Sequence, residues 1–224
     1  MPMSGARFPI GGRLIVLAGI SAIGGVMFIP FLAAGSGQPM PQLIGFAAIV
    51  TLIATLVAWP GLRCADAVSL PMPYLRGLDG GDEEGIGRRA VAVTVALSVG
   101  LGVLAIIALR MVNAPPLPGS TLARALSTFF AAGPLEIVLH LGVMSVVVWL
   151  ARGRRWPGIL AAALALVLFH LSGGGAAETP PLVIASVIGN GAMGLALGWV
   201  YAAYGFEMVM LGHAVAHLIV VVAG

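Results

Sequence analysis

Seven apolar runs dominate this sequence and strongly limit what it can fold into. A helix that crosses a membrane needs about 20 apolar residues in a row, and such runs lie at 14–35, 43–62, 90–112, 123–151, 157–173, 181–204 and 206–223. Charged residues make up 8% of the chain, whereas soluble domains average about 25%. The sequence therefore predicts an all-α, polytopic transmembrane helix bundle of about seven spans, and six or eight spans also fit the pattern.

The basic residues predict how this bundle is oriented. All 11 are arginines, and most fall at the N-terminus and in alternate connections: Arg7, Arg13, Arg63, Arg76, Arg88, Arg89, Arg152, Arg154 and Arg155. Because cytoplasmic loops are enriched in basic residues, we expect a protein integral to a bacterial-type inner (cytoplasmic) membrane, with its N-terminus in the cytoplasm. Its first partner is then the lipid bilayer, and the arginines indicate topology rather than a nucleic-acid partner.

The connections suggest how the chain is organised. The longest one, 63–89, holds five of the eight acidic residues together with proline and glycine, which is typical of a solvated linker. We expect residues 1–122 to form N-terminal transmembrane helices with this cytoplasmic loop. Residues 123–224 are expected to form a second helical core.

Glycines in the C-terminal half predict close helix packing. Gly194 and Gly198 have the small-xxx-small spacing that lets two helix backbones approach each other. The last two apolar runs are separated only by the residues around Tyr204 and Gly205. We therefore expect a tight turn there and tightly packed helices on either side of it.

Five ionisable side chains lie inside the later spans. Glu136 and His140 are one helical turn apart, His213 and His217 repeat that spacing, and His170 lies near the end of another run. Ionisable groups are costly in hydrocarbon and mark a functional site by default. A single such histidine is more often a structural hydrogen-bonding group, but three packed helices can bring all five groups into one site.

Such a site predicts one of two chemistries. A desolvated carboxylate beside imidazoles suits general acid–base catalysis on water. The same groups are ligands for a divalent metal such as zinc, so the cofactor stays open at this point. The run His213-Ala-Val-Ala-His217 lacks the central glutamate of the HExxH zinc-protease motif, so its spacing alone is weak evidence for zinc.

The end of the chain carries a more specific pattern. A glycine-rich run, Gly194–Gly205, is followed by Leu211-Gly-His-Ala-Val-Ala-His-Leu218. This arrangement resembles the CAAX-protease and bacteriocin-processing family (the Abi or CPBP intramembrane proteases), whose motifs are EExxxR, FxxxH and HxxxN or HxxxD. His213 matches the histidine of the third motif, and His217 stands where the family has Asn or Asp. His170 matches that of the second motif, with Leu166 in place of Phe.

The first motif is matched in part by Gly133-Pro-Leu-Glu136-Ile-Val-Leu-His140. Glu136 falls on the second glutamate, Leu135 replaces the first, and His140 replaces the arginine. In the family the glutamates are held to activate water, while the histidines support the oxyanion or, in another view, bind metal. The resemblance covers roughly residues 125–220, and it implies a catalytic site made of Glu136, His140, His170, His213 and His217.

Two functions follow from these residues. The first is a CAAX-protease-like intramembrane endopeptidase that cleaves a membrane-associated or lipidated peptide, with Glu136 activating water. The alternative is a catalytically inactive family member that acts as a binding or assembly subunit of a membrane complex, ligating metal or pigment through histidine. The missing glutamate, arginine and asparagine favour this alternative. A transporter with a Glu136–His140 proton relay ranks third, because no second half of the chain mirrors the site.

Overall fold

The computed structural model describes residues 11–36, 39–78, 86–112, 120–172 and 180–223. These residues form helices and no strand, which confirms the predicted all-α fold. The helices are α1 (Gly11–Ser36), α2 (Met40–Ala67), α3 (Pro73–Gly77), α4 (Arg88–Met111), α5 (Thr121–Glu136), the π-helix η1 (Ile137–Met144), α6 (Ser145–Leu150), α7 (Arg155–Ser172), α8 (Pro180–Tyr204) and α9 (Phe206–Ala223).

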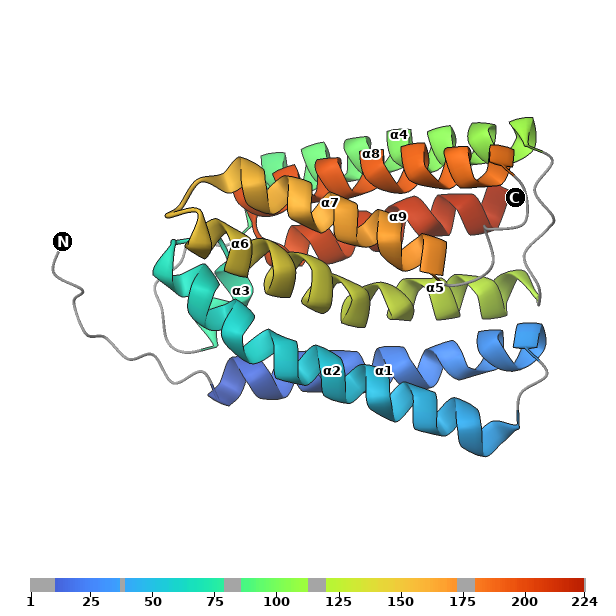
Figure 1. Cartoon of the computed structure of the whole chain (residues 1–224), viewed down its shortest axis with the longest axis horizontal. Helices are drawn as coiled ribbons and strands as arrows, with labels where there is room; N and C mark the ends of the chain where they lie inside the picture. Colours follow the sequence, from blue (N-terminus) through green and yellow to red (C-terminus); the bar gives the residue numbers. More distant parts are fainter. Residues whose placement is uncertain (1–10, 37–38, 79–85, 113–119, 173–179, 224) are drawn as a thin grey trace, which may run out of the picture.

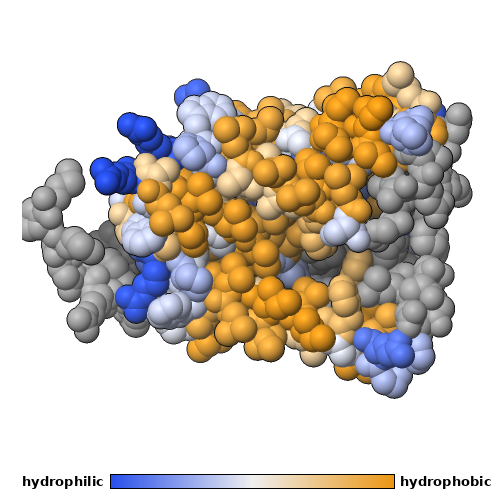
Figure 2. All heavy atoms as spheres, viewed as in Figure 1, coloured by the Kyte–Doolittle hydropathy of each residue, from blue (hydrophilic) through white to orange (hydrophobic). Residues whose placement is uncertain are grey.

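The helices agree with the apolar runs of the sequence. Six described segments are long and apolar enough to cross a membrane, and a shorter apolar helix covers Phe206–Val222. The fourth run is one continuous rod built from α5, η1 and α6 (Figure 1). Figure 2 shows hydrophobic side chains across the middle of the molecule and hydrophilic ones at its ends, most of them on the left. The chain is therefore an integral membrane protein whose exposed apolar side chains face a lipid bilayer.

The rod of α5, η1 and α6 occupies the centre of the bundle (Figure 1). In its candidate membrane span, Ala132–Leu150, 61% of the residues are buried inside the protein, against 22–28% in the other five candidate spans. Helices α1 and α2 pack on one side of it, and α7 and α9 pack on the other. Polar groups on this span are therefore the best shielded from lipid.

Close packing of α7 and α8 follows from the two glycines that the sequence singled out. A Cβ on Gly194 would lie 2.5 Å from the Cα of Ala163, and one on Gly198 would lie 3.0 Å from Cγ2 of Ile159. Both distances are shorter than ordinary van der Waals contact. The expected small-xxx-small contact is confirmed, and it brings α7, which carries His170, against α8.

The predicted tight turn is also present. Helix α8 ends at Tyr204 and α9 begins at Phe206, so Gly205 alone connects them. Its φ of +116° lies in a region that L side chains rarely adopt. The backbone N–H of Phe206 donates to the carbonyl of Pro71 at 3.2 Å, which fixes this turn against the segment before α3.

The 63–89 connection differs from the solvated linker that its composition suggested. Helix α2 continues through its first residues to Ala67, and α3 forms within it. Asp66 bonds the guanidinium of Arg13, whose side chain is 1% exposed, at 3.0 and 2.9 Å. Arg76 also bonds this carboxylate, at 3.4 Å. The prediction of a plain linker is wrong for residues 63–78, because composition does not reveal an ion pair between residues that are 53 positions apart in the sequence. The other four acids, Asp79, Asp82, Glu83 and Glu84, lie outside the described residues.

Candidate functional site

The backbone changes from α-helix to π-helix where the site begins. Pro134 lies within α5 and removes one backbone N–H, and the π-helix starts directly after Glu136. Runs of π-helix are rare and occur frequently at functional sites. A Cβ on Gly61 of α2 would clash with the carbonyl of Leu141, so α2 packs directly on the π-helix backbone. The segment that carries His140 is thus held by the helix beside it.

Glu136 is the centre of the site. Its Oε2 contacts Nδ1 of His140, and its Oε1 contacts Nδ1 of His213, 77 residues further along the chain. Glu136 and His140 are fully buried, and His213 is 2% exposed. The predicted convergence of the fourth and seventh apolar runs is therefore present in the structure, and one carboxylate joins them.

The two contacts determine which ring nitrogen of each imidazole carries the proton. An ionised carboxylate can only accept hydrogen bonds, so both histidines donate from Nδ1 to Glu136. In a neutral imidazole the other nitrogen, Nε2, then keeps a free lone pair. Nε2 of His140 is buried and has no hydrogen-bond partner among the described residues. A carboxylate that accepts from Nδ1 fixes the tautomer and the orientation of the ring.

His217 extends the group along α9. Its ring stacks on that of His213, with 4.5 Å between ring centroids and 27° between planes. It interacts electrostatically with His213, His170 and Glu136. We refer to Glu136, His140, His213 and His217 as the Glu–His cluster. His217 is half-buried, so the cluster extends from the fully buried Glu136 to a partly accessible edge.

His170 lies beside the cluster but is not bonded to it. Its Nδ1 is 2.9 Å from the carbonyl oxygen of Leu166 on its own helix, and its ring packs edge-on against Phe169 at 5.5 Å. It interacts electrostatically with His213 and His217. Four of the five predicted site residues are therefore in direct contact, and the fifth is a neighbour. Among the described residues, no group of three or more His, Cys, Asp or Glu side chains is arranged to hold a metal ion.

Comparisons of the chain with family models, curated proteins and solved structures found no match. The resemblance to CAAX-type proteases accordingly stays a prediction that rests on the residues quoted above.

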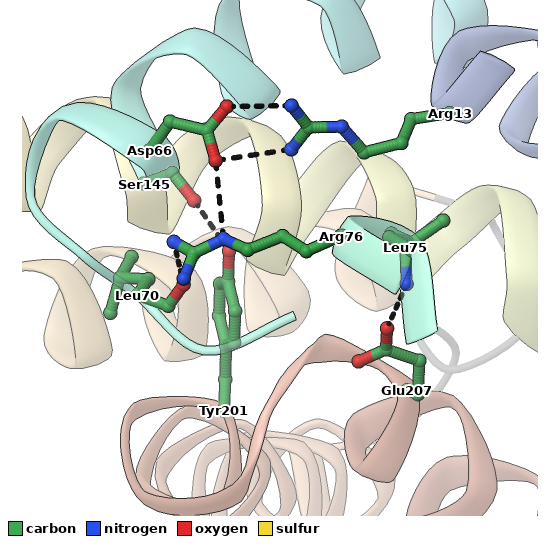
Figure 3. A network of polar contacts seen from close by, with 8 residues as sticks. All are labelled: Arg13, Asp66, Leu70, Leu75, Arg76, Ser145, Tyr201 and Glu207. Atoms are coloured by element: carbon green, nitrogen blue, oxygen red, sulfur yellow. Dashed lines mark hydrogen bonds and ion pairs between the residues drawn. The ribbon is translucent and has the colours of Figure 1, made fainter. Parts of the chain in front are cut away.

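Sequence reasoning missed two polar residues near the site. Ser145 and Tyr201 are both fully buried, and their hydroxyl oxygens are 2.9 Å apart (Figure 3). Each lies within an apolar run, where a hydroxyl must find a partner inside the protein. A polar residue within an apolar run can be recognised in the sequence. Which hydroxyl bonds which depends on how α6 and α8 pack.

Proposed function

We propose that this protein is an intramembrane endopeptidase in which the Glu–His cluster activates a water molecule. The observation that supports this most directly is the buried carboxylate of Glu136, which bonds Nδ1 of both His140 and His213. A carboxylate that holds an imidazole in one tautomer, with the other nitrogen free to take a proton, is the arrangement by which hydrolases generate a nucleophile. Here one carboxylate serves two imidazoles.

The geometry supports a division of roles within the cluster. Each oxygen of Glu136 contacts an imidazole, so we assign to this carboxylate the role of orienting the two rings. Nε2 of His140 or His213 is then the general base. The half-buried ring of His217 can donate a hydrogen bond to the oxyanion that forms when water attacks a peptide carbonyl. His170 donates from Nδ1 to the carbonyl of Leu166, so its neutral ring can accept a hydrogen bond at Nε2 and position the water. The direct water-activating role expected for Glu136 is thereby assigned to its imidazole partners.

The surroundings of the cluster suggest the class of substrate. Glu136 lies within a span whose neighbours expose apolar side chains to lipid, so a substrate reaches the cluster from within or beside the bilayer. A membrane-associated or lipidated peptide fits that route.

Most arginines lie at the end of the bundle that carries the start of α1 and the α6–α7 connection. We place this end, and with it the N-terminus, on the cytoplasmic side of a bacterial-type inner membrane.

A second candidate function rests on the burial of the cluster. Glu136 and His140 are fully buried, and both carboxylate oxygens are paired, as expected for a structural polar centre in a subunit of a membrane complex. In that case the partly accessible histidines His170 and His217 are the ones available to a metal or pigment. Such a protein keeps its fold and binds its partner without cleaving any peptide.

A cleavage assay in proteoliposomes distinguishes the two functions. The probes are fluorogenic peptides with a prenylated C-terminal cysteine and single-span transmembrane peptides, with products mapped by mass spectrometry. We expect wild type to cleave at least one probe. His140→Gln or His213→Gln, whichever removes the general base, should lose about 100-fold or more, which is the contribution of a general base. The control is Asn190→Ala, because Asn190 is a polar residue within a span whose side chain, among the described residues, bonds only Ser186 of its own helix. Cleavage that survives both His140→Gln and His213→Gln unchanged rejects the proposed catalytic role of the cluster.

A further inference from the structure

Ser145 and Tyr201 connect the π-helix to α8. Tyr201 is fully buried, packs edge-on against Phe206 at 5.9 Å between ring centroids, and places its hydroxyl 2.9 Å from Oγ of Ser145 (Figure 3). Ser145 follows the last residue of the π-helix. The pair therefore joins α8 to the end of the segment that carries His140.

The same serine binds the backbone of His140. Its N–H bonds the carbonyls of Gly142 and His140, and its Oγ bonds the carbonyl of His140 at 3.4 Å. In an α-helix that carbonyl would accept instead from the N–H of Met144, four residues on. The serine hydroxyl adds a second donor to the i→i+5 bond, and it thereby favours the π form over the α form at this turn.

Both hydroxyl groups can donate in the same direction along this chain of bonds, from Tyr201 towards His140. Tyr201 donates its O–H to Oγ of Ser145, and Ser145 donates its own O–H to the carbonyl of His140. A chain of hydrogen bonds in a low-dielectric interior strengthens each member. A tyrosine hydroxyl buried at this depth also requires a partner. Removal of the Tyr201 hydroxyl leaves Ser145 bonded to the carbonyl of His140 but without its donor, and removal of the Ser145 hydroxyl breaks both bonds.

The helix register links this contact to the Glu–His cluster. One residue more or less in a helix rotates everything beyond it by about 100°. Relaxation of the π-helix to an α-helix would therefore turn Glu136 and His140 relative to α6, which packs against α2 and α7. The contacts of Glu136 with His140 and with His213 on α9 depend on that register.

We propose that Ser145 and Tyr201 are positioning residues that hold His140 in place by fixing the end of the π-helix. They act through the carbonyl of His140. The effect on cleavage rests on the proposed function, whereas the effect on the His140 ring does not. Neither residue belongs to the catalytic set expected from the sequence.

The test is the NMR signals of the ring nitrogens in full-length protein labelled with ¹⁵N-histidine, purified in detergent. His140→Gln assigns the His140 signals by their loss. We expect Tyr201→Phe, which removes one oxygen, and Ser145→Ala to shift the His140 signals in the same direction, with the larger shift for Ser145→Ala because it breaks both bonds. The double variant should add nothing to the shift of Ser145→Ala, because that change already breaks the whole chain of bonds. Tyr204→Phe is the matched control, since Tyr204 packs edge-on against Trp199 outside this chain of bonds.

The cleavage assay gives a second readout on the same variants. Tyr201→Phe is expected to lower kcat about 10- to 100-fold, the size of effect that a displaced catalytic group produces, and to leave KM close to wild type. His140 signals that stay at their wild-type positions in both Tyr201→Phe and Ser145→Ala overturn the proposal, whatever the activity. If wild type cleaves no probe, the endopeptidase assignment fails while the NMR result still decides the role of the pair. Should one variant not fold, the other still removes the Tyr201–Ser145 bond.

Discussion

Substitution of Gly194 by alanine tests how closely α7 and α8 pack. The new Cβ would lie 2.5 Å from the Cα of Ala163, about 0.9 Å short of the 3.4 Å at which ordinary contact begins. The obstacle is backbone, so the helices must move apart or tilt. Overpacking of this kind costs about 1–3 kcal/mol. Against it stands the preference of a helix for alanine over glycine, about 0.8–1 kcal/mol.

Gly189 provides the matched control on the same helix. A Cβ there meets nothing within 4 Å, so Gly189→Ala should gain the helix preference without the clash. The helix term cancels between the two variants, and their free energies of unfolding should differ by about 1–3 kcal/mol, with Gly194→Ala the less stable. Unfolding of both proteins in mixed detergent–dodecyl sulfate micelles measures this difference. Equal stability would refute the packing distance on which the placement of α7, and so of His170, depends.

Two further predictions concern the arginine-rich end of the bundle. Asp66→Ala should destabilise the protein, because loss of one partner of a buried ion pair costs about 3–5 kcal/mol, and the cost is smaller here since the Asp66 side chain is 28% exposed. Asp66→Asn should lose less stability in the same unfolding assay. No loss of stability in either variant would contradict the role of the pair with Arg13. Gly205→Ala should lower the thermal midpoint, because φ is +116° and a Cβ would lie 2.8 Å from Cδ of Pro73. Gly153→Ala, with positive φ but open space around it, should lose less, and an equal loss would show that the Pro73 contact is unimportant.

The fold could be predicted from the sequence because its signals are local. The length of each apolar run determines a span, and a glycine between two runs allows a one-residue turn at Gly205. The fourth run was expected as a single helix, and its central π-helix was not expected. Hydropathy does not distinguish i→i+4 from i→i+5 bonds, since both leave the same residues apolar.

The site could be predicted as a set of residues but not as a set of bonds. Glu136, His140 and the α9 histidines stand out because ionisable groups are rare in apolar runs. Which oxygen of Glu136 meets which ring depends on the packing of α5 against α9, and those helices are far apart in sequence. The pairing of Arg13 with Asp66 was missed for the same reason, since an arginine at the start of a span is first interpreted as a topology signal.

The most direct test of the Glu–His cluster is the rate of peptide cleavage by Glu136→Gln beside Glu207→Gln. Glutamine keeps the shape of Glu136 but removes its charge, and its amide can accept from only one imidazole Nδ1 while it donates to the other. One ring must then change tautomer. Glu207 accepts from the N–H of Leu75 at 2.9 Å through Oε1, and a glutamine oxygen can still accept that bond.

We expect Glu136→Gln to reduce cleavage about 100-fold or more and Glu207→Gln to cleave at close to the wild-type rate. A Glu136→Gln protein that folds and cleaves like wild type would contradict the claim that this carboxylate prepares the histidines for catalysis.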